Sequence, residues 1–178
     1  MPVSFDGFDQ GQIGFLQQAF SLMQRASGKA KSSLLSGNLT AYRKWFDAKG
    51  TAHLMKVATI VNEADAAING RPITFAKLDR PGVNVDTSNL CAYVFLVRSG
   101  QFLHHVGTGM RVLIVWSTHA AMDVSYLSET MYHELTHKVG STTDVTYDQA
   151  ACLQLAQSQP EQAVRNAENY NLFLGEFF

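Results

Sequence analysis

Apolar residues recur near helical spacing in two stretches of the first 70 residues. The first stretch contains Phe15, Phe20, Leu22 and Met23, and the second contains Leu54, Val57, Ile60 and Val61. Because spacings of three and four place side chains on one helix face, both stretches are predicted to be helical. A Ser-, Gly- and Lys-rich connector at residues 28–37 and a short segment at residues 41–46 are expected between them. Gly70-Arg71-Pro72 is expected to end the helix that starts near Thr51.

The middle of the chain contains three stretches rich in β-branched and aromatic residues, at positions 73–75, 91–97 and 112–116. Gly, Pro, Asp and Asn bound these stretches, which is typical of strands. The glycine-containing segment 106–110 predicts a turn between two antiparallel strands. The pattern therefore predicts a small antiparallel-rich sheet.

After Trp116 the helical pattern returns, and Ser128 is expected to cap a helix that ends at Gly140. Met131, Leu135 and Val139 form its apolar stripe. Two later segments, 146–149 and 158–161, match the capping-box pattern and predict helices near 147–157 and 159–174. The whole chain, residues 1–178, is thus predicted to form a single α+β domain.

Composition narrows the class of protein. The chain has 178 residues, of which 46% are hydrophobic and 16% charged, with a formal net charge of −1. It has no polybasic stretch, so nucleic acid and anionic membranes are not expected as partners, and no apolar run is long enough to span a membrane. Cys91 and Cys152 are expected to be buried, reduced thiols, although the sequence leaves their pairing open.

The strongest chemical signal is His133-Glu134-Leu135-Thr136-His137. Two His at positions i and i+4 project from one helix face, well away from the apolar stripe. This geometry suits two imidazole nitrogens that bind one Zn²⁺, with Glu134 beside the metal as a general base.

A catalytic zinc site usually takes three protein ligands, so a third is expected after the helix ends. Asp144 is the nearest carboxylate and the preferred choice, while Asp148, Glu161 and Glu168 remain alternatives. A metzincin pattern is disfavoured because Thr143 occupies its third-histidine position and no Met follows Met131. A gluzincin pattern, with Glu161 or Glu168 as the third ligand, stays open.

The segment from His133 to Tyr147 resembles the signature of the aspzincin metallopeptidases, the deuterolysin and peptidyl-lysine endopeptidase family. That signature is H-E-x-x-H followed by G-T-x-D-x-x-Y-G, and residues 166–170 resemble the family's N-A-[DE]-[NS]-x segment. The specific part covers about residues 130–175. The resemblance implies a zincin fold with one Zn²⁺ per chain, bound by His133, His137 and Asp144. It also implies Glu134 as the catalytic acid/base and Tyr147 as a stabiliser of the transition state.

The chain departs from the signature at two positions, since Ser141 and Asp148 stand where the family usually has Gly. Lysine-specific members of the family bind the substrate lysine with two acidic residues near the N-A-D segment. Glu168 matches one of them, whereas Asn171 stands at the position of the other. The resemblance therefore raises a preference for Lys as a hypothesis. Asn166 and Asn169 are interpreted as structural hydrogen-bond anchors.

The sequence thus predicts a zinc metalloendopeptidase that acts as a monomer on protein or peptide substrates. The alternative is a non-proteolytic zinc-binding protein on a zincin scaffold that acts through protein–protein contacts. The N-terminus lacks the features of a secretory signal. We therefore expect a protein that is retained in the cytoplasm, a bacterial effector or secreted protease that is exported without such a signal, or a sequence given in its mature form.

Overall fold

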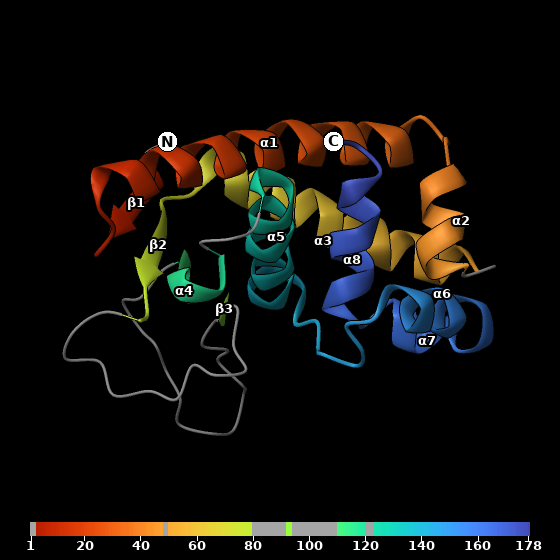
Figure 1. Ribbon diagram of the computed structural model, residues 1–178. Helices are drawn as coiled ribbons and strands as arrows, with labels where there is room; N and C mark the ends of the chain where they lie inside the picture. Colours follow the sequence, from red (N-terminus) through yellow and green to blue (C-terminus); the bar gives the residue numbers. More distant parts are fainter. Residues whose placement is uncertain (1–2, 48–49, 80–91, 94–109, 120–122) are drawn as a thin grey trace, which may run out of the picture.

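The computed structural model describes residues 3–47, 50–79, 92–93, 110–119 and 123–178 (Figure 1). The strands are β1 (Val3–Asp6), β2 (Ile73–Lys77), β3 (Ala92–Tyr93) and β4 (Met110–Ile114). The helices are α1 (Gln10–Leu35), α2 (Thr40–Phe46), α3 (Thr51–Gly70), α4 (Trp116–His119), α5 (Val124–Gly140), α6 (Gln149–Ser158), α7 (Pro160–Ala163) and α8 (Ala167–Gly175). The α+β composition is as the sequence predicts; that the chain forms a single domain stays a prediction.

The sheet has the strand order β1-β2-β4-β3 within the described residues. The β1–β2 and β2–β4 pairs are parallel, and only the short β3 pairs antiparallel with β4. The prediction of an antiparallel-rich sheet is therefore not confirmed. Parallel neighbours need a long crossover, which α1, α2 and α3 supply between β1 and β2. The sequence pattern did not reveal β1 or the direction of pairing.

The observed bounds of the strands also differ from the predicted ones. The third predicted strand ends at Ile114, and Trp116 begins α4 instead. The Asp79 carboxylate explains this change, because it accepts hydrogen bonds from the backbone N–H groups of Trp116 and Ser117, each at 2.7 Å. Of the strand predicted at 91–97, β3 is the described part. The predicted glycine turn lies outside the described residues, apart from Met110.

In the N-terminal half, α1 runs without interruption through most of the predicted connector. A capping box between Asp9 and Gln12 starts α1. Ala26, Ser27 and Ala30 are fully buried, so packing holds the helix together through a stretch with a weak local preference for helix. The helix predicted to start near Thr51 and stop at Gly70 is confirmed as α3.

Helix α5 begins five residues earlier than predicted, with its N-cap at Asp123 instead of Ser128. The Asp123 side chain accepts a hydrogen bond from the Tyr126 N–H at 2.8 Å. Ser128 is instead a buried residue within the helix. The helix includes Gly140, and Ser141 takes the left-handed C-cap conformation (φ 50°, ψ 38°) that was expected of the glycine.

The C-terminal helices also differ from the prediction, in their N-caps and in their bounds. Asp148, rather than Thr146, caps α6 and accepts a hydrogen bond from the Ala151 N–H at 2.8 Å. The single helix predicted near 159–174 is two helices, α7 and α8, with Asn166 as the N-cap of α8. The turn between them brings Asn166 beside the loop that follows α5, and this contact is decisive for the site.

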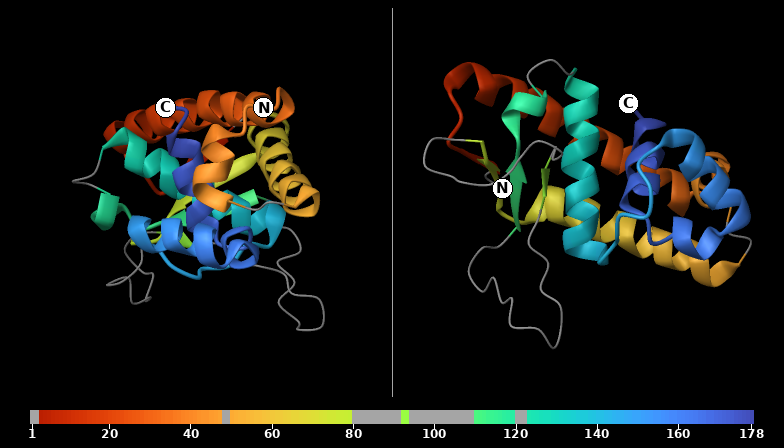
Figure 2. Two further views of the ribbon diagram at one scale, coloured as in Figure 1. Left: turned by 90° about the vertical axis from the view of Figure 1, so that its right-hand side faces the viewer. Right: turned by 60° about the horizontal axis from the view of Figure 1, so that its bottom comes forward.

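Helix α5 lies at the centre of the molecule and packs against α1, α3 and α8 (Figure 1). The sheet lies at one end, and α2, α6 and α7 gather at the other (Figure 2). Trp45, Phe46, Tyr170 and Phe173 are among the fully buried aromatic residues of the core. Cys152 is buried and forms no disulfide within the described residues, whereas Cys91 lies outside them. None of the described helices is long and apolar enough to cross a membrane.

Candidate metal centre

Helix α5 positions the three residues of the predicted motif. His133, Glu134 and His137 are buried, with exposed fractions of 6–7%. The C-terminal turn of the helix lies tightly against α3, since a Cβ on Gly140 would come within 2.8–2.9 Å of the Ile60 side chain. The glycine therefore allows α5 to approach α3 closely at the end that carries His137.

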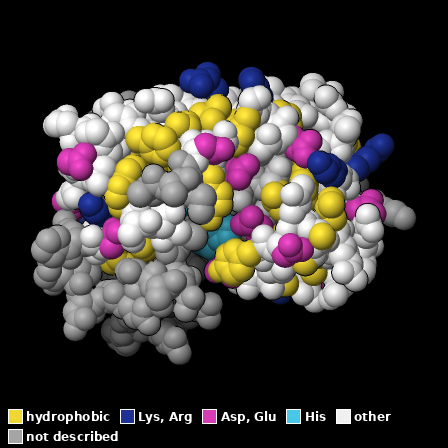
Figure 3. All heavy atoms as spheres, in the orientation of Figure 1, with side chains coloured by type: hydrophobic (Ala, Val, Ile, Leu, Met, Phe, Trp, Pro, Cys, Tyr) yellow, Lys and Arg dark blue, Asp and Glu magenta, His cyan; other side chains and the backbone are white. Residues whose placement is uncertain are grey.

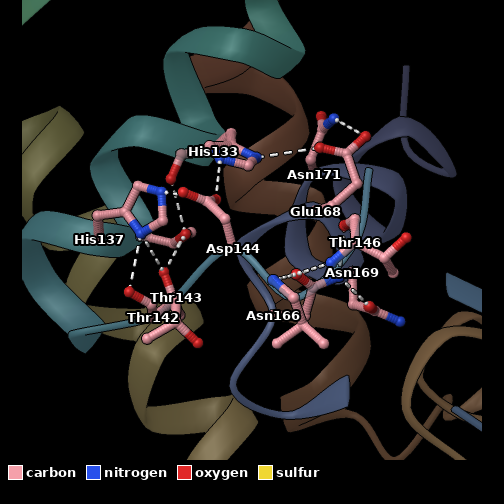
Figure 4. Close-up of polar contacts among 12 residues, drawn as sticks. His133, His137, Thr142, Thr143, Asp144, Thr146, Asn166, Glu168, Asn169 and Asn171 are labelled. Carbon is pink, nitrogen blue, oxygen red and sulfur yellow. Dashed lines mark hydrogen bonds and ion pairs between the residues drawn. The ribbon is translucent and has the colours of Figure 1, made fainter. Parts of the chain in front are cut away.

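Asp144 comes to both histidines from the loop after α5. Its Oδ1 atom lies 3.0 Å from Nε2 of His133 and 3.2 Å from Nε2 of His137. The two imidazole rings are 4.8 Å apart between centroids and nearly perpendicular. Figure 4 shows both rings directed toward the Asp144 carboxylate. The left-handed turn at Ser141 reverses the chain so that this carboxylate can reach the helix.

The other nitrogen of each imidazole has its own partner. Nδ1 of His137 donates to the backbone carbonyl oxygen of Thr142 at 2.8 Å, and Nδ1 of His133 lies 3.0 Å from Oε2 of Glu168. A carbonyl or a carboxylate accepts the Nδ1 proton, which leaves the Nε2 lone pair free to bind a metal. The two Nε2 atoms and Oδ1 of Asp144 therefore converge on one point.

Asn166 holds the loop that carries Asp144. Its Oδ1 accepts hydrogen bonds from the N–H groups of Val145 and Thr146 at 2.9 and 3.3 Å, and its Nδ2 donates to the Thr146 carbonyl at 3.0 Å. Its Nδ2 also donates to Oδ1 of Asn169 at 2.7 Å. Asn166 and Asn169 are thus the structural anchors that the sequence analysis proposed. Both side chains are fully buried.

The ionisable groups of the site change one another's pKa values. Burial lowers the pKa of His133, but the hydrogen bonds to Asp144 and Glu168 outweigh it and bring the pKa to about 9. Burial alone would raise the pKa of Asp144, yet the hydrogen bonds and charges of the two histidines hold it well below its usual range. Burial raises the pKa of Glu134, and the histidines act in the opposite direction. The hydrogen bonds between His133 and Asp144 thus shift the pKa values of these two groups in opposite directions.

Tyr147 covers one side of the cluster. Its ring stacks on His133, with centroids 5.9 Å apart and an interplanar angle of 17°, although 64% of the residue is exposed. Burial of the hydroxyl, together with the charge of Asp144 and a hydrogen bond to it, raises the pKa of Tyr147. The hydroxyl therefore lies close to the carboxylate of the cluster. In Figure 3 the visible His side chains border both acidic and hydrophobic atoms.

The donor set fits a zinc ion. The ligand atoms of His133, His137 and Asp144 all lie within 4.8 Å of one another. Two imidazole nitrogens and one carboxylate oxygen are typical ligands of catalytic zinc. Of the alternatives for the third ligand, Asp148 caps α6, Glu161 is exposed on α7, and Glu168 contacts Nδ1 of His133 instead of the Nε2 side.

Glu168 and Asn171 lie behind His133 on α8. Besides its contact with His133, Glu168 accepts a hydrogen bond through Oε1 from Nδ2 of Asn171 at 3.0 Å. Glu168 thus supports the Nδ1 side of the imidazole, a role that the sequence analysis did not assign. Thr142 was also missed. Its backbone carbonyl oxygen accepts a hydrogen bond from Nδ1 of His137. A pattern of side chains along the sequence cannot predict such a contact with the backbone.

Comparisons with known proteins give a match to a family and a match to a fold. A family model described as lysine-specific metallo-endopeptidase, that of the aspzincins, matches residues 30–175. Among solved structures, a zinc peptidase from Grifola frondosa is similar, with a TM-score of 0.74 and 20% sequence identity. The similarity covers 95% of this chain and 97% of that one, and at this identity it establishes the fold. A search of curated proteins gave no significant match. On the family match, the chain belongs to the aspzincin family of zinc metallopeptidases.

Proposed function

We propose that this protein is a zinc-dependent endopeptidase that hydrolyses peptide bonds, with zinc held by His133, His137 and Asp144. The observation that carries the proposal is the convergence of two Nε2 atoms and one carboxylate oxygen on a single point beside Glu134. When bound there, zinc supplies Lewis acidity, which polarises a carbonyl group and lowers the pKa of water to about 7.

Glu134 is proposed as the general base and acid. It precedes His137 by three residues on the same buried turn of α5, and its carboxyl is electrostatically coupled to both histidines and to Asp144. In this role the carboxylate accepts a proton from the attacking water and later delivers it to the leaving amine. The buried setting limits exchange of that proton with bulk solvent.

Tyr147 is proposed to stabilise the transition state. Its ring is fixed against His133 while much of its surface stays accessible to a substrate. The phenol is a hydrogen-bond donor at neutral pH, and it can donate to the oxyanion that forms when water attacks the carbonyl carbon.

A preference for a basic substrate side chain, Lys in particular, is proposed from the acidic surroundings of the site. Glu168 lies next to His133 and accepts a hydrogen bond from Asn171 on the same helix. Export or delivery to another cell stays a prediction, which localisation of the protein in producing cells and culture medium would check.

The test compares zinc content and casein cleavage for the wild type and Glu134→Ala. We expect both proteins to bind zinc and only the wild type to cleave, with Glu161→Ala, a change at an exposed residue, behaving like the wild type. A wild type without zinc, or equal cleavage by Glu134→Ala, would refute the proposal.

The alternative, a zinc-loaded binding protein without proteolysis, rests on the departures from the family signature at Ser141 and Asp148. In the structure both departures are compatible with the donor set, since Ser141 makes the left-handed turn and Asp148 caps α6. Cleavage that a chelator abolishes and zinc restores would exclude this alternative.

A further inference from the structure

Two hydroxyl groups connect the proposed histidine ligands to each other. Thr136 lies on α5 between His133 and His137, and Thr142 follows the left-handed turn at Ser141. Oγ1 of Thr142 lies 3.1 Å from Nδ1 of His137 and 3.0 Å from Oγ1 of Thr136. Oγ1 of Thr136 lies 2.8 Å from the backbone carbonyl oxygen of His133. These contacts form a chain from the ring of one histidine to the backbone of the other.

The two ends of this hydroxyl chain fix the direction of its hydrogen bonds. A carbonyl oxygen can only accept, so Thr136 donates its hydroxyl proton to His133. At the other end, Nδ1 of His137 lies 2.8 Å from the carbonyl oxygen of Thr142, and it must carry a proton to make this bond (Figure 4). A protonated Nδ1 cannot accept from Oγ1 of Thr142, which therefore donates its own proton to Thr136. Every bond thus points from His137 toward His133.

Burial makes this arrangement hard to replace. Thr136 and Thr142 are fully buried, and His137 is nearly so. In such surroundings hydrogen bonds are strong, and a donor left without an acceptor is costly. The arrangement in which all three donors find an acceptor is therefore preferred over one in which a proton points at another proton.

The two histidines differ in what lies behind them. Nδ1 of His133 faces the carboxylate of Glu168, which can only accept. Among the described residues, the hydrogen-bond partners of Nδ1 of His137 are the neutral oxygens of Thr142. A hydroxyl can donate as well as accept. If Thr142 donated to Nδ1, the ring proton would reside on Nε2 and occupy the lone pair that a metal needs.

We propose that Thr136 and Thr142 are positioning residues, whose one-way hydroxyl chain keeps the ring proton of His137 on Nδ1 and leaves Nε2 open to zinc. Thr136 acts on the ring through Thr142, because its oxygen takes the proton that Thr142 would otherwise present to Nδ1. The inference rests on the zinc site proposed above and assigns a role to two hydroxyl groups outside its ligand set.

The first experiment measures zinc affinity by competition with a chromophoric chelator. Thr136→Val keeps the shape of the side chain but removes the oxygen that accepts from Thr142, and we expect it to bind zinc about tenfold more weakly. Thr136→Ser keeps the hydroxyl and should bind like the wild type. Thr59→Val on α3 is the control, since the exposed Thr59 hydroxyl likewise donates to a helix carbonyl, that of Met55 at 2.8 Å. Wild-type affinity in Thr136→Val overturns the proposal; if that variant does not fold, Thr136→Ala carries the same expectation.

The second experiment separates the placement of the proton from packing. Thr142→Val removes the competing donor, while the carbonyl oxygen of Thr142 still requires a proton on Nδ1 of His137. We therefore expect Thr136→Val/Thr142→Val to bind zinc at least about threefold more tightly than Thr136→Val, although it lacks a further hydroxyl. If packing alone were responsible, the second substitution would weaken binding further or leave it unchanged. Either of these results overturns the proposal.

Cleavage assays on the same proteins distinguish this inference from the peptidase function. Zinc binding that shows these differences, without cleavage of any peptide, would exclude the peptidase function and leave the hydroxyl chain in place. Normal cleavage with equal zinc affinities in all variants would exclude the hydroxyl chain alone. A wild type that binds no zinc would exclude both.

Discussion

Nδ1 of His133 on α5 lies 3.0 Å from Oε2 of Glu168 on α8. This contact joins two residues that are 35 positions apart in the sequence. It gives the imidazole a defined orientation, with Nε2 turned toward Asp144. A residue that the family resemblance assigns to substrate recognition thus also supports a proposed metal ligand.

Glu168→Gln is expected to weaken zinc binding by about tenfold to a hundredfold. The amide oxygen can still accept the Nδ1 proton, but the negative charge that strengthens His133 as a ligand is lost. Competition with a chromophoric chelator measures the affinity. Glu161→Gln, an exposed residue on α7, serves as the control. An affinity equal to that of the wild type would show that the contact does not support the metal.

Tyr147→Phe is expected to lower kcat by about 10²–10³. The phenylalanine ring keeps the stacking on His133 but cannot donate a hydrogen bond to an oxyanion. Steady-state kinetics on a peptide substrate, with zinc content measured in parallel, tests this expectation. A loss of zinc that accounts for the loss of activity would instead assign the hydroxyl to the support of Asp144.

Ser141→Gly is expected to stabilise the fold by about 1 kcal/mol. Ser141 is in the left-handed region at φ 50°, where a side chain is unfavourable and glycine is not. Urea denaturation gives the free energy of unfolding. Ser141→Ala retains a Cβ and should show no such gain, so equal stabilities for the Gly and Ala variants would contradict the argument.

Glu129→Gln is expected to make metal-free protein more stable at neutral pH. Burial, followed by the negative charges of Glu168 and Asp123, raises the pKa of Glu129 from 4.5 to about 7. Between these values the unfolded chain therefore releases this proton first. The free energy of unfolding of the wild type therefore falls, through this group, as the pH rises from about 4.5 to about 7. Because the glutamine side chain does not ionise, the free energy of unfolding of Glu129→Gln does not fall through this group as the pH rises.

The gain should be no more than about 1 kcal/mol, because solvent screens a partly exposed carboxyl. Thermal unfolding of both proteins between pH 4 and pH 9 measures the difference. It should be absent at pH 4 and constant above pH 8. A difference that is the same at every pH would assign the effect to packing against Gly175 of α8 rather than to ionisation.

Local patterns predicted much of the helical structure. The helix from Thr51 to Gly70 follows from apolar spacing and the Gly-Arg-Pro stop, both of which act within a few residues. Helix α1 shows the limit of such reasoning, since burial of Ser27 and Ala30 overrides a composition typical of a connector. The parallel sheet was missed for a related reason: the direction of strand pairing depends on crossovers through three helices.

The sequence by itself determined the pair His133 and His137, because four residues of a helix place two side chains on one face whatever surrounds them. It also ranked Asp144 first among the possible third ligands. Only the tertiary structure decided that Asp144 reaches both Nε2 atoms, that Asn166 holds its loop, and that Glu168 lies behind His133. The residues in these contacts lie between 7 positions apart (His137 and Asp144) and 35 positions apart (His133 and Glu168). The contacts depend on how α5, its following loop and α8 pack rather than on any spacing along the chain.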